Sequence, residues 1–243
     1  ISKPQIIKSL KKIITSASNS DIRPEISSTL FNVRNNFLVL TTTDSFRLSE
    51  EKIPKKYFSS KTSNFSFLLP KQTTEELIRI LDNIEENDIE ASLSQKDIII
   101  STKTLTIFSR LTDGKFPEYQ DIIPKNFSTN IFVNRKKLME NIRSASIFAD
   151  KLFEVCLKLN SKENTLTLST KNREVGEHSS SIDVDSNGKD IELVLNWRYL
   201  LDGIVNMEDE EIFLGINDKS NPIIIKPKKM EDSIYLIMPM KEM

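Results

Sequence analysis

Residues 67–84, with the sequence FLLPKQTTEELIRILDNI, join a short apolar segment to a helix-forming segment, and this junction decides the fold. After Pro70 the apolar residues recur at helical spacing, which predicts an amphipathic helix with one buried face. The same junction returns at residues 193–205, LVLNWRYLLDGIV, where Asn196 is a suitable N-cap for the second helix. The two copies lie roughly 125 residues apart, so they indicate a duplicated domain and not a solenoid of short repeats.

Other elements are duplicated with a similar offset. The apolar residues between 6 and 14 predict a helix, and its counterpart covers residues 135–145. Short β-branched or aromatic runs predict strands at residues 37–40, 89–93, 98–100, 104–108, 166–168, 212–216, 223–225 and 233–238.

These elements predict an α+β fold that is built from two repeated domains. In each domain, two helices are expected to pack on one face of an antiparallel sheet. The polar, proline-containing stretch 113–130 is the natural linker, so we place the domains at residues 1–126 and 127–243.

The composition excludes most classes of enzyme. The 243 residues include five glycines, and neither a Walker loop nor a dinucleotide-binding spacing occurs. Any histidine-dependent chemistry would rest on His178, the single histidine, which lies in a polar tract and is expected to be solvated. The single cysteine, Cys156, lies in a strand-like run and is expected to be a small buried residue. We therefore expect a binding or scaffolding protein with no catalytic residues, metal or cofactor.

The sequence also bears on the compartment. No apolar run reaches the roughly 18 residues that a membrane span requires, and the first residues lack the apolar block of a signal peptide. One cysteine excludes an intrachain disulfide, which suits a reducing compartment. We expect a cytoplasmic protein with no membrane partner.

The charges nearly cancel, with 34 basic against 35 acidic side chains, but a neutral total can hide a segregated distribution. Lys8 and Lys12 fall opposite the apolar face of the first helix, in a stretch of 20 residues without an acid. Outward positions on the third helix are taken by Lys136, Lys137 and Arg143. If the domains form one curved array, these cations would line a concave wall that suits a phosphate backbone. On the residues alone, ordinary solvent-facing lysines remain the alternative.

Three further segments carry a family resemblance. They are TDSFRL at residues 43–48, DGKFPEY at residues 113–119 and YLIMPM at residues 235–240. Together they resemble the hallmark segments of the bacterial DNA polymerase III β subunit family, the β sliding clamps. Their order and spacing resemble that family across nearly the whole chain. The resemblance covers the family's second and third domains only, and the first domain would precede Ile1.

The resemblance implies a head-to-tail dimer whose six similar domains form a closed ring around double-stranded DNA. Such a ring would be a bacterial processivity factor that holds the replicative polymerase on its template and has no catalytic step. Arg23 lies in the loop 19–25, where the family contacts DNA at the ring face, although Pro24 and Glu25 replace the aromatic residues that are frequent there. The positions assigned to DNA binding are Lys8, Lys12, Arg23, Lys71, Gln72, Lys136, Lys137 and Arg143.

The resemblance also implies a pocket for short, partly hydrophobic peptides of polymerases, the clamp loader and repair proteins. Methionines suit a pocket that serves many partners, because they are adaptable and polarisable. Taken singly, each apolar member has core packing as its alternative. Ser45 and Phe46 replace a commoner Gly-His, which would reshape one subsite. The residues assigned to peptide binding are Ile26, Thr43, Ser45, Phe46, Arg47, Leu48, Pro117, Ile122, Phe153, Asn196, Tyr199, Ile237, Met238, Pro239, Met240 and Lys241.

A subunit interface is implied at Ile147 and Phe148, which follow the third helix. In the family, this surface meets the first domain of the neighbouring subunit. We therefore expect the full-length protein to form the dimeric ring, and this two-domain piece to be mostly monomeric. The alternative class of function is a duplicated α+β scaffold that binds other proteins and never touches DNA.

Overall fold

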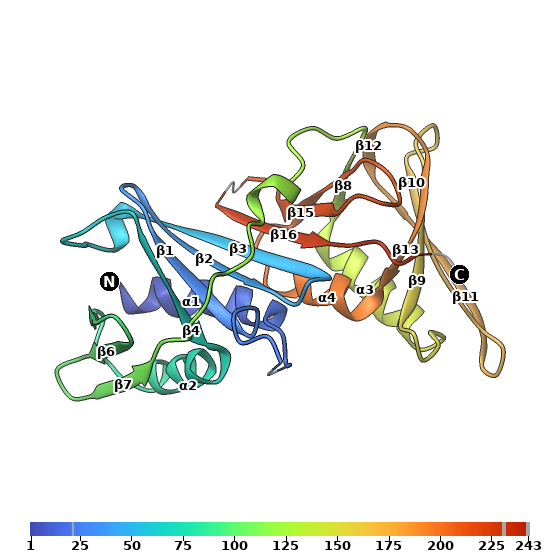
Figure 1. Cartoon of the computed structure of the whole chain (residues 1–243). Helices are drawn as coiled ribbons and strands as arrows, with labels where there is room; N and C mark the ends of the chain where they lie inside the picture. The colour runs from blue at the N-terminus through green and yellow to red at the C-terminus, as the bar shows by residue number, and fades with distance from the viewer. Residues whose placement is uncertain (21, 230–231, 242–243) are drawn as a thin grey trace. The chain divides into compact units, whose positions relative to one another are not determined.

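A computed structural model describes residues 1–20, 22–229 and 232–241 (Figure 1). The packing of the backbone separates two compact units, Ile1–Glu118 and Tyr119–Met243. The linker pattern had placed the boundary between residues 126 and 127, whereas the segment from Tyr119 goes with the second unit. There the side-chain amide of Asn217 donates a 3.0 Å hydrogen bond to the carbonyl oxygen of Asn126.

The first unit contains two helices and seven strands in its described residues. The sheet β3-β2-β1-β4 and the smaller sheet β5-β6-β7 are antiparallel throughout. Short 3₁₀ turns, η1 (Ile14–Ser16) and η2 (Lys55–Tyr57), follow α1 and β3. The main elements are α1 (Lys3–Ile13), β1 (Ser28–Val33), β2 (Phe37–Thr43), β3 (Arg47–Pro54), β4 (Phe65–Pro70), α2 (Lys71–Asp82), β5 (Glu90–Leu93), β6 (Asp97–Ser101) and β7 (Thr106–Arg110).

The core of the first unit lies between its helix pair and its sheets. Figure 1 shows α1 and α2 side by side, and α1 packs on β2 and β3 while α2 packs on β1 and β4. The apolar face of α1 supplies Leu10 and Ile13, and α2 supplies Leu81, all fully buried. Truncating such a leucine to alanine costs about 2–5 kcal/mol, because a cavity remains. The helix positions are therefore set by the apolar periodicity of the sequence.

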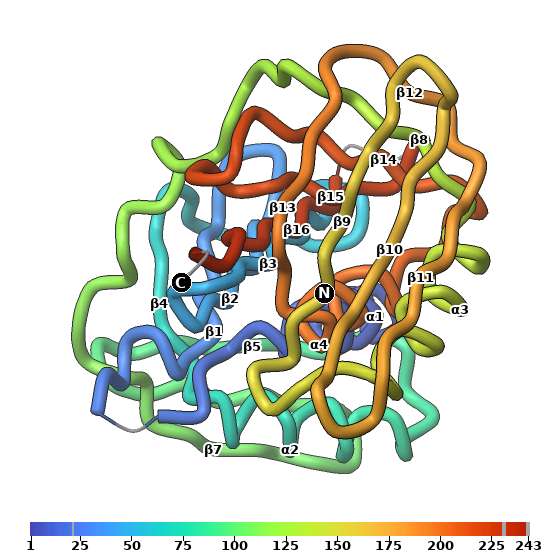
Figure 2. Tube along the Cα trace, turned by 90° about the vertical axis from the view of Figure 1, so that its right-hand side faces the viewer, coloured from blue at the N-terminus to red at the C-terminus, as the bar shows by residue number. Residues whose placement is uncertain are grey.

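The second unit repeats this arrangement with additional strands. One antiparallel sheet has the order β11-β10-β9-β13, and β12-β8-β14-β15-β16 follow one another in a second set of antiparallel pairs. Figure 2 shows the long strands β9, β10 and β11 side by side. The elements are η3 (Gln120–Ile122), β8 (Thr129–Asn134), α3 (Arg135–Ser146), β9 (Glu154–Asn160), β10 (Thr165–Asn172), β11 (Gly176–Asp183), β12 (Asp185–Gly188), β13 (Ile191–Asn196), α4 (Trp197–Val205), β14 (Glu211–Ile216), β15 (Ile223–Pro227) and β16 (Ser233–Ile237).

The predicted α+β class and the internal duplication are confirmed. From its first α-helix onward, each unit runs through a helix, a group of strands, a second helix and three closing strands, and in the second unit η3 and β8 precede that first helix. The predicted cap is also confirmed, since the Asn196 side chain accepts hydrogen bonds from the backbone N–H groups of Arg198 and Tyr199. The predicted linker 113–130 was wrong in part, because it includes η3 and the start of β8. Among the described residues, none of the helices combines the length and the apolar character that crossing a bilayer would need.

Candidate functional site

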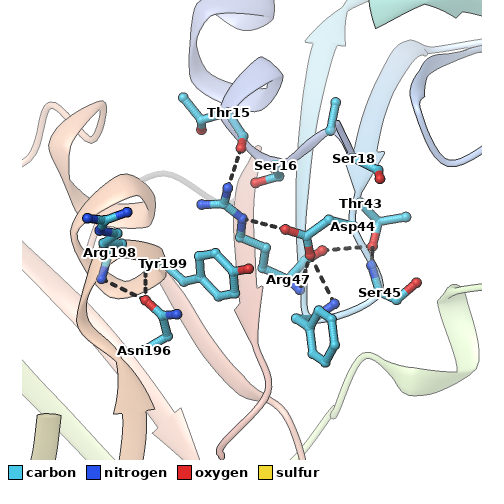
Figure 3. A network of polar contacts seen from close by, with 12 residues as sticks. Thr15, Ser16, Ser18, Thr43, Asp44, Ser45, Arg47, Asn196, Arg198 and Tyr199 are labelled. Atoms are coloured by element: carbon cyan, nitrogen blue, oxygen red, sulfur yellow. Dashed lines mark hydrogen bonds and ion pairs between the residues drawn. The ribbon is translucent and has the colours of Figure 1, made fainter. Parts of the chain in front are cut away.

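The turn between β2 and β3 is held by a dense set of hydrogen bonds that involve the side chains of Asp44 and Thr43 (Figure 3). One carboxylate oxygen of Asp44 accepts from the backbone N–H groups of Phe46 and Arg47, each at 3.0 Å. The other lies 2.9 Å from Nε of Arg47. The Thr43 hydroxyl donates to the carbonyl oxygen of Arg47 at 2.7 Å and accepts from the backbone N–H of Ser45 at 3.1 Å. The turn is therefore rigid before any ligand arrives.

This turn holds Phe46 out in solvent. Its side chain is 61% exposed, whereas Thr43 and Leu48 on either side of the turn are buried. Ser45 has a φ of +78°, a left-handed conformation that is unusual for a residue with a side chain. Arg47 is anchored again where its Nη2 donates to the carbonyl oxygen of Thr15 at 2.6 Å. The sequence TDSFRL therefore places an aromatic ring on an anchored, strained turn.

In the second unit, the C-terminal segment is fixed beside β13. The backbone N–H of Met240 donates a 2.8 Å hydrogen bond to the carbonyl oxygen of Val194. Met238, Pro239 and Met240 are half-buried, and Lys241 is exposed. Because Asn196 closes β13 and caps α4, the apolar C-terminal residues and the start of α4 belong to one small region.

The position of α4 in this region depends on Tyr235 of β16. Its hydroxyl donates to the carbonyl oxygen of Tyr199 at 2.7 Å. A Cβ on Gly203 would lie 2.4 Å from the Tyr235 ring, so only glycine allows the helix to approach this closely. The helix therefore presents Tyr199 at a defined place near its N-terminus, with the side chain half-buried.

An aromatic cluster borders the start of α4. The guanidinium carbon of Arg198 lies 3.7 Å from the centroid of the Phe153 ring, and the Trp197 ring meets that of Phe153 edge to face at 6.3 Å. Phe153 has a φ of +62°, and its carbonyl oxygen accepts from the backbone N–H of Trp197 at 2.8 Å. Neither Arg198 nor Trp197 is among the residues that the sequence assigned to a site. The run Trp-Arg-Tyr after a capping asparagine was the available signal.

The remaining residues assigned to peptide binding differ in exposure. Ile26 and Leu48 of the first unit and Ile237 of the second are buried among core residues. Pro117 of the first unit is half-buried, and Ile122 of the second is exposed. Within each unit, the structure thus brings together residues 43–48, and separately Asn196, Tyr199 and residues 238–241.

Lys12 was expected to point away from the sheet, but it forms an ion pair with a residue of the sheet. Its ammonium lies 3.2 Å from the carboxylate of Glu51 on β3, and only 13% of its side chain is exposed. The reason is that α1 packs directly on β3, so a lysine at the margin of the apolar face reaches the sheet. The prediction of a lysine pointing away from the sheet was wrong for Lys12, while Lys8 is half-buried.

Lys71 and Arg23, which were also assigned to DNA binding, have internal partners as well. The Lys71 ammonium donates to the carbonyl oxygen of Ala17 at 3.1 Å and to the side-chain oxygen of Asn19 at 2.5 Å. Nε of Arg23 lies 3.0 Å from the Glu25 carboxylate. A backbone hydrogen bond, and then Arg23, lower the pKa of Glu25 below its ordinary value. Gln72 is exposed at the start of α2.

In the second unit, the cations assigned to DNA binding lie on α3 and are accessible. Lys136, Lys137 and Arg143 are exposed, while Leu138 and Ile142 on the opposite side of the helix are fully buried. Within residues 1–20, 22–229 and 232–241, none of these three side chains forms an ion pair. Their charges are therefore available to an anionic ligand.

The residues after α3 include the proposed interface pair. Ile147 is 72% exposed. The Phe148 ring stacks on the ring of His178 from β11, with centroids 5.7 Å apart and an angle of 9° between the planes. The expectation of a solvated His178 was wrong, because this stacking leaves the residue half-buried.

Strand register separates Cys156 from His178. Cys156 on β9 lies opposite Ser169 of β10, and His178 on β11 lies opposite the next residue, Thr170. Successive side chains on a strand point to opposite faces, so the thiol and the imidazole lie on opposite faces of the sheet. Burial, and then the Glu192 carboxylate, raise the pKa of the Cys156 thiol. No nucleophilic pair is formed, and the described residues hold no cluster of metal-binding side chains.

Comparisons with known proteins agree over both units. The family model of the DNA polymerase III beta subunit central domain matches residues 1–118, and that of its C-terminal domain matches residues 120–241. The beta sliding clamp of Bacillus subtilis (strain 168) is 26% identical over 234 residues, which are 96% of this chain and 61% of the relative. The beta sliding clamp of Staphylococcus aureus (strain Mu50 / ATCC 700699) is 25% identical over 240 residues, 97% of this chain and 63% of the relative.

The fold is found in solved structures as well. The crystal structure of the DNA polymerase III beta subunit from Thermotoga maritima matches with a TM-score of 0.93 at 24% identity. The match covers 100% of this chain and 65% of that one. The chain thus spans less than two thirds of the length of these relatives.

Proposed function

The chain belongs to the DNA polymerase III beta subunit family, and from this premise we propose that it acts as part of a DNA sliding clamp. Such a clamp encircles duplex DNA and tethers the replicative polymerase and other replication and repair proteins. The observation that carries the proposal is the match of two consecutive domains of one family to the two α+β units. The clamp acts by binding, without a catalytic step.

DNA would be held through its phosphates and not through its bases. Lysine is a mobile, hydrated point charge, which suits loose contact with a backbone that must slide. The exposed cations of α3, Lys136, Lys137 and Arg143, support this role most directly. Lys12 and Lys71 have internal partners, so we assign them a smaller share of the binding.

Partner peptides would bind to apolar residues with a few polar groups beside them. In the second unit, Met238, Pro239 and Met240 supply the half-buried apolar surface, and Tyr199 supplies a polar tip. In the first unit, Phe46 supplies an exposed ring on a turn that needs no ordering. The partners we propose are the replicative polymerase, the clamp loader and repair proteins.

The salt dependence of duplex binding tests the DNA part of this proposal. Each phosphate contact contributes about 0.9 to the slope of log K against log salt. Changing Lys136 and Lys137 together to glutamate is therefore expected to make the slope less steep by about two. The matched control is Lys162→Glu, an exposed lysine in the turn between β9 and β10. Fluorescence anisotropy of a labelled duplex, titrated at a series of salt concentrations, provides the measurement. An unchanged slope would instead favour a scaffold that binds proteins and not DNA.

A further inference from the structure

Arg198 is a charged side chain that is exposed and yet held in place. Its guanidinium carbon lies 3.7 Å from the centroid of Phe153 and 5.4 Å from that of Trp197. Figure 3 shows Arg198 and Tyr199 leaving the start of α4 in different directions. A guanidinium that lies over an aromatic ring keeps the N–H groups at its edge available for hydrogen bonds.

The backbone fixes the ring beneath the guanidinium. The backbone N–H of Phe153 donates to the carbonyl oxygen of Asp150 at 3.1 Å, and its own carbonyl oxygen accepts from Trp197 at 2.8 Å. The left-handed φ of +62° at Phe153 is maintained by these two hydrogen bonds. Asn196 fixes the first turn of α4 from the other side. Both partners of the stack are therefore placed before a ligand binds.

The charge of Arg198 has no acidic partner in the part of the chain that the structure describes. Among the described residues, its side chain forms no ion pair. Asp150, an acid of the neighbouring loop, has a carboxylate oxygen that accepts from the backbone N–H of Leu152 at 2.9 Å. The planar fork of an arginine matches a carboxylate in a bidentate pair, which is stronger than a neutral hydrogen bond.

Only a short stretch of chain separates Arg198 from the proposed peptide surface. Met240 is bonded to Val194, two residues before the Asn196 that caps α4, and Arg198 is two residues beyond that cap. A peptide whose apolar residues contact Met238 and Met240 would therefore bring its neighbouring residues to Arg198. We propose that Arg198 recognises an aspartate or glutamate beside the apolar residues of the bound peptide and so helps to select clamp partners. This inference rests on the peptide binding proposed above.

Selection from a displayed library of random peptides provides the first test. Wild-type protein is expected to enrich peptides that have an acidic residue next to an apolar pair. The Arg198→Gln variant is expected to enrich apolar pairs without the acid. A library that yields no binder for the wild-type protein would overturn the peptide-binding function itself, and this inference with it. Binders without acid enrichment would overturn this inference alone.

A matched pair of synthetic peptides provides the second test. The best wild-type binder is compared with its copy in which the acid is replaced by its amide, and the readout is the ratio of the two dissociation constants. We expect wild-type protein to favour the acid about five- to tenfold, as an exposed but preorganised charged pair should. Arg198→Gln should bring the ratio close to one, and Arg198→Lys, which keeps the charge but loses the fork, should give an intermediate ratio.

Two further variants separate recognition from general charge and from misfolding. Lys162→Gln removes one positive charge at the other end of β9 and should leave the ratio as in wild type. Phe153→Leu removes the ring beneath Arg198 without changing any charge and should lower the ratio. Circular dichroism melting checks that each variant is folded. A ratio that is the same in wild type, Arg198→Gln and Arg198→Lys would overturn the inference.

Discussion

The backbone N–H of Met240 is bonded to the carbonyl oxygen of Val194 at 2.8 Å, so the C-terminal segment is held against strand β13. The Met240 side chain is half-buried and belongs to the surface proposed for peptides. Met240→Ala keeps the backbone bond and removes most of the apolar side chain. We expect peptide affinity to fall about tenfold, since burial of such a side chain contributes about 1.5–3 kcal/mol.

The measurement is a peptide titration by fluorescence anisotropy, with Val205→Ala as the control. Val205 is an exposed apolar residue at the end of α4, and its truncation should not change peptide affinity. Equal affinities for wild-type and Met240→Ala protein would remove Met240 from the proposed site.

The left-handed φ of Ser45 makes the β2–β3 turn sensitive to the shape of that side chain. Ser45→Val should lower the free energy of unfolding by about 1–2 kcal/mol, because a β-branched residue is strained in this conformation. Ser45→Gly should be tolerated, since glycine adopts this conformation readily. Denaturant unfolding of both variants measures the difference. If valine and glycine have the same effect, the turn has a different conformation in solution.

The ion pair between Lys12 and Glu51 should stabilise the fold more than it contributes to DNA binding. Glu51 is 4% exposed, so loss of the Lys12 ammonium removes a partner from a buried carboxylate. We expect Lys12→Ala to cost about 1–3 kcal/mol of unfolding free energy, and Lys162→Ala to cost less, because Lys162 is exposed. Urea unfolding of the two variants decides the matter. Equal stabilities would show that the pair is not formed in solution.

The thiol of Cys156 should react slowly with alkylating reagents in the native protein. Burial raises its pKa, so less thiolate is present at a given pH than for a free cysteine. The folded state favours the protonated thiol of Cys156. This preference contributes to the stability of the fold at pH values below the pKa of the unfolded chain's thiol, and the contribution is lost as the pH rises through the higher pKa of the folded state. Iodoacetamide rates across alkaline pH, with the urea-unfolded protein as reference, test this. A native rate equal to the unfolded rate would contradict it.

The association state of this chain can be measured directly. Ile147, at the proposed contact surface, is exposed in this chain, and we expect the chain by itself to be a monomer at micromolar concentration. Sedimentation velocity provides the measurement, and Ile147→Glu should leave the sedimentation coefficient unchanged. A stable wild-type dimer that Ile147→Glu dissociates would show instead that this surface pairs two copies of the chain.

The helices and their caps were predictable from the sequence because their signals are local. Asn196 precedes an apolar run at helical spacing, and the structure shows it capping α4. The position of β12 was not predictable, because a short polar strand owes its formation to pairing with a distant strand. The same applies to the boundary between the units, which depends on which unit the segment from Tyr119 packs against.

The candidate site, too, was predictable only where its signals are local in the sequence. The segment TDSFRL was found from its residues, but its rigidity comes from hydrogen bonds that only coordinates show. Arg198 and Phe153 are 45 positions apart in the sequence, and no periodicity connects them.

The sequence by itself determined the duplicated α+β architecture and the family, because helical periodicity, caps and ordered motifs are properties of neighbouring residues. Only the tertiary structure decided that Lys12 reaches Glu51, that Cys156 and His178 lie on opposite faces of a sheet, and that Arg198 lies over Phe153. The physical reason is that side-chain partners depend on strand register and on the packing of helices against sheets. Both are settled by contacts between residues far apart in the chain.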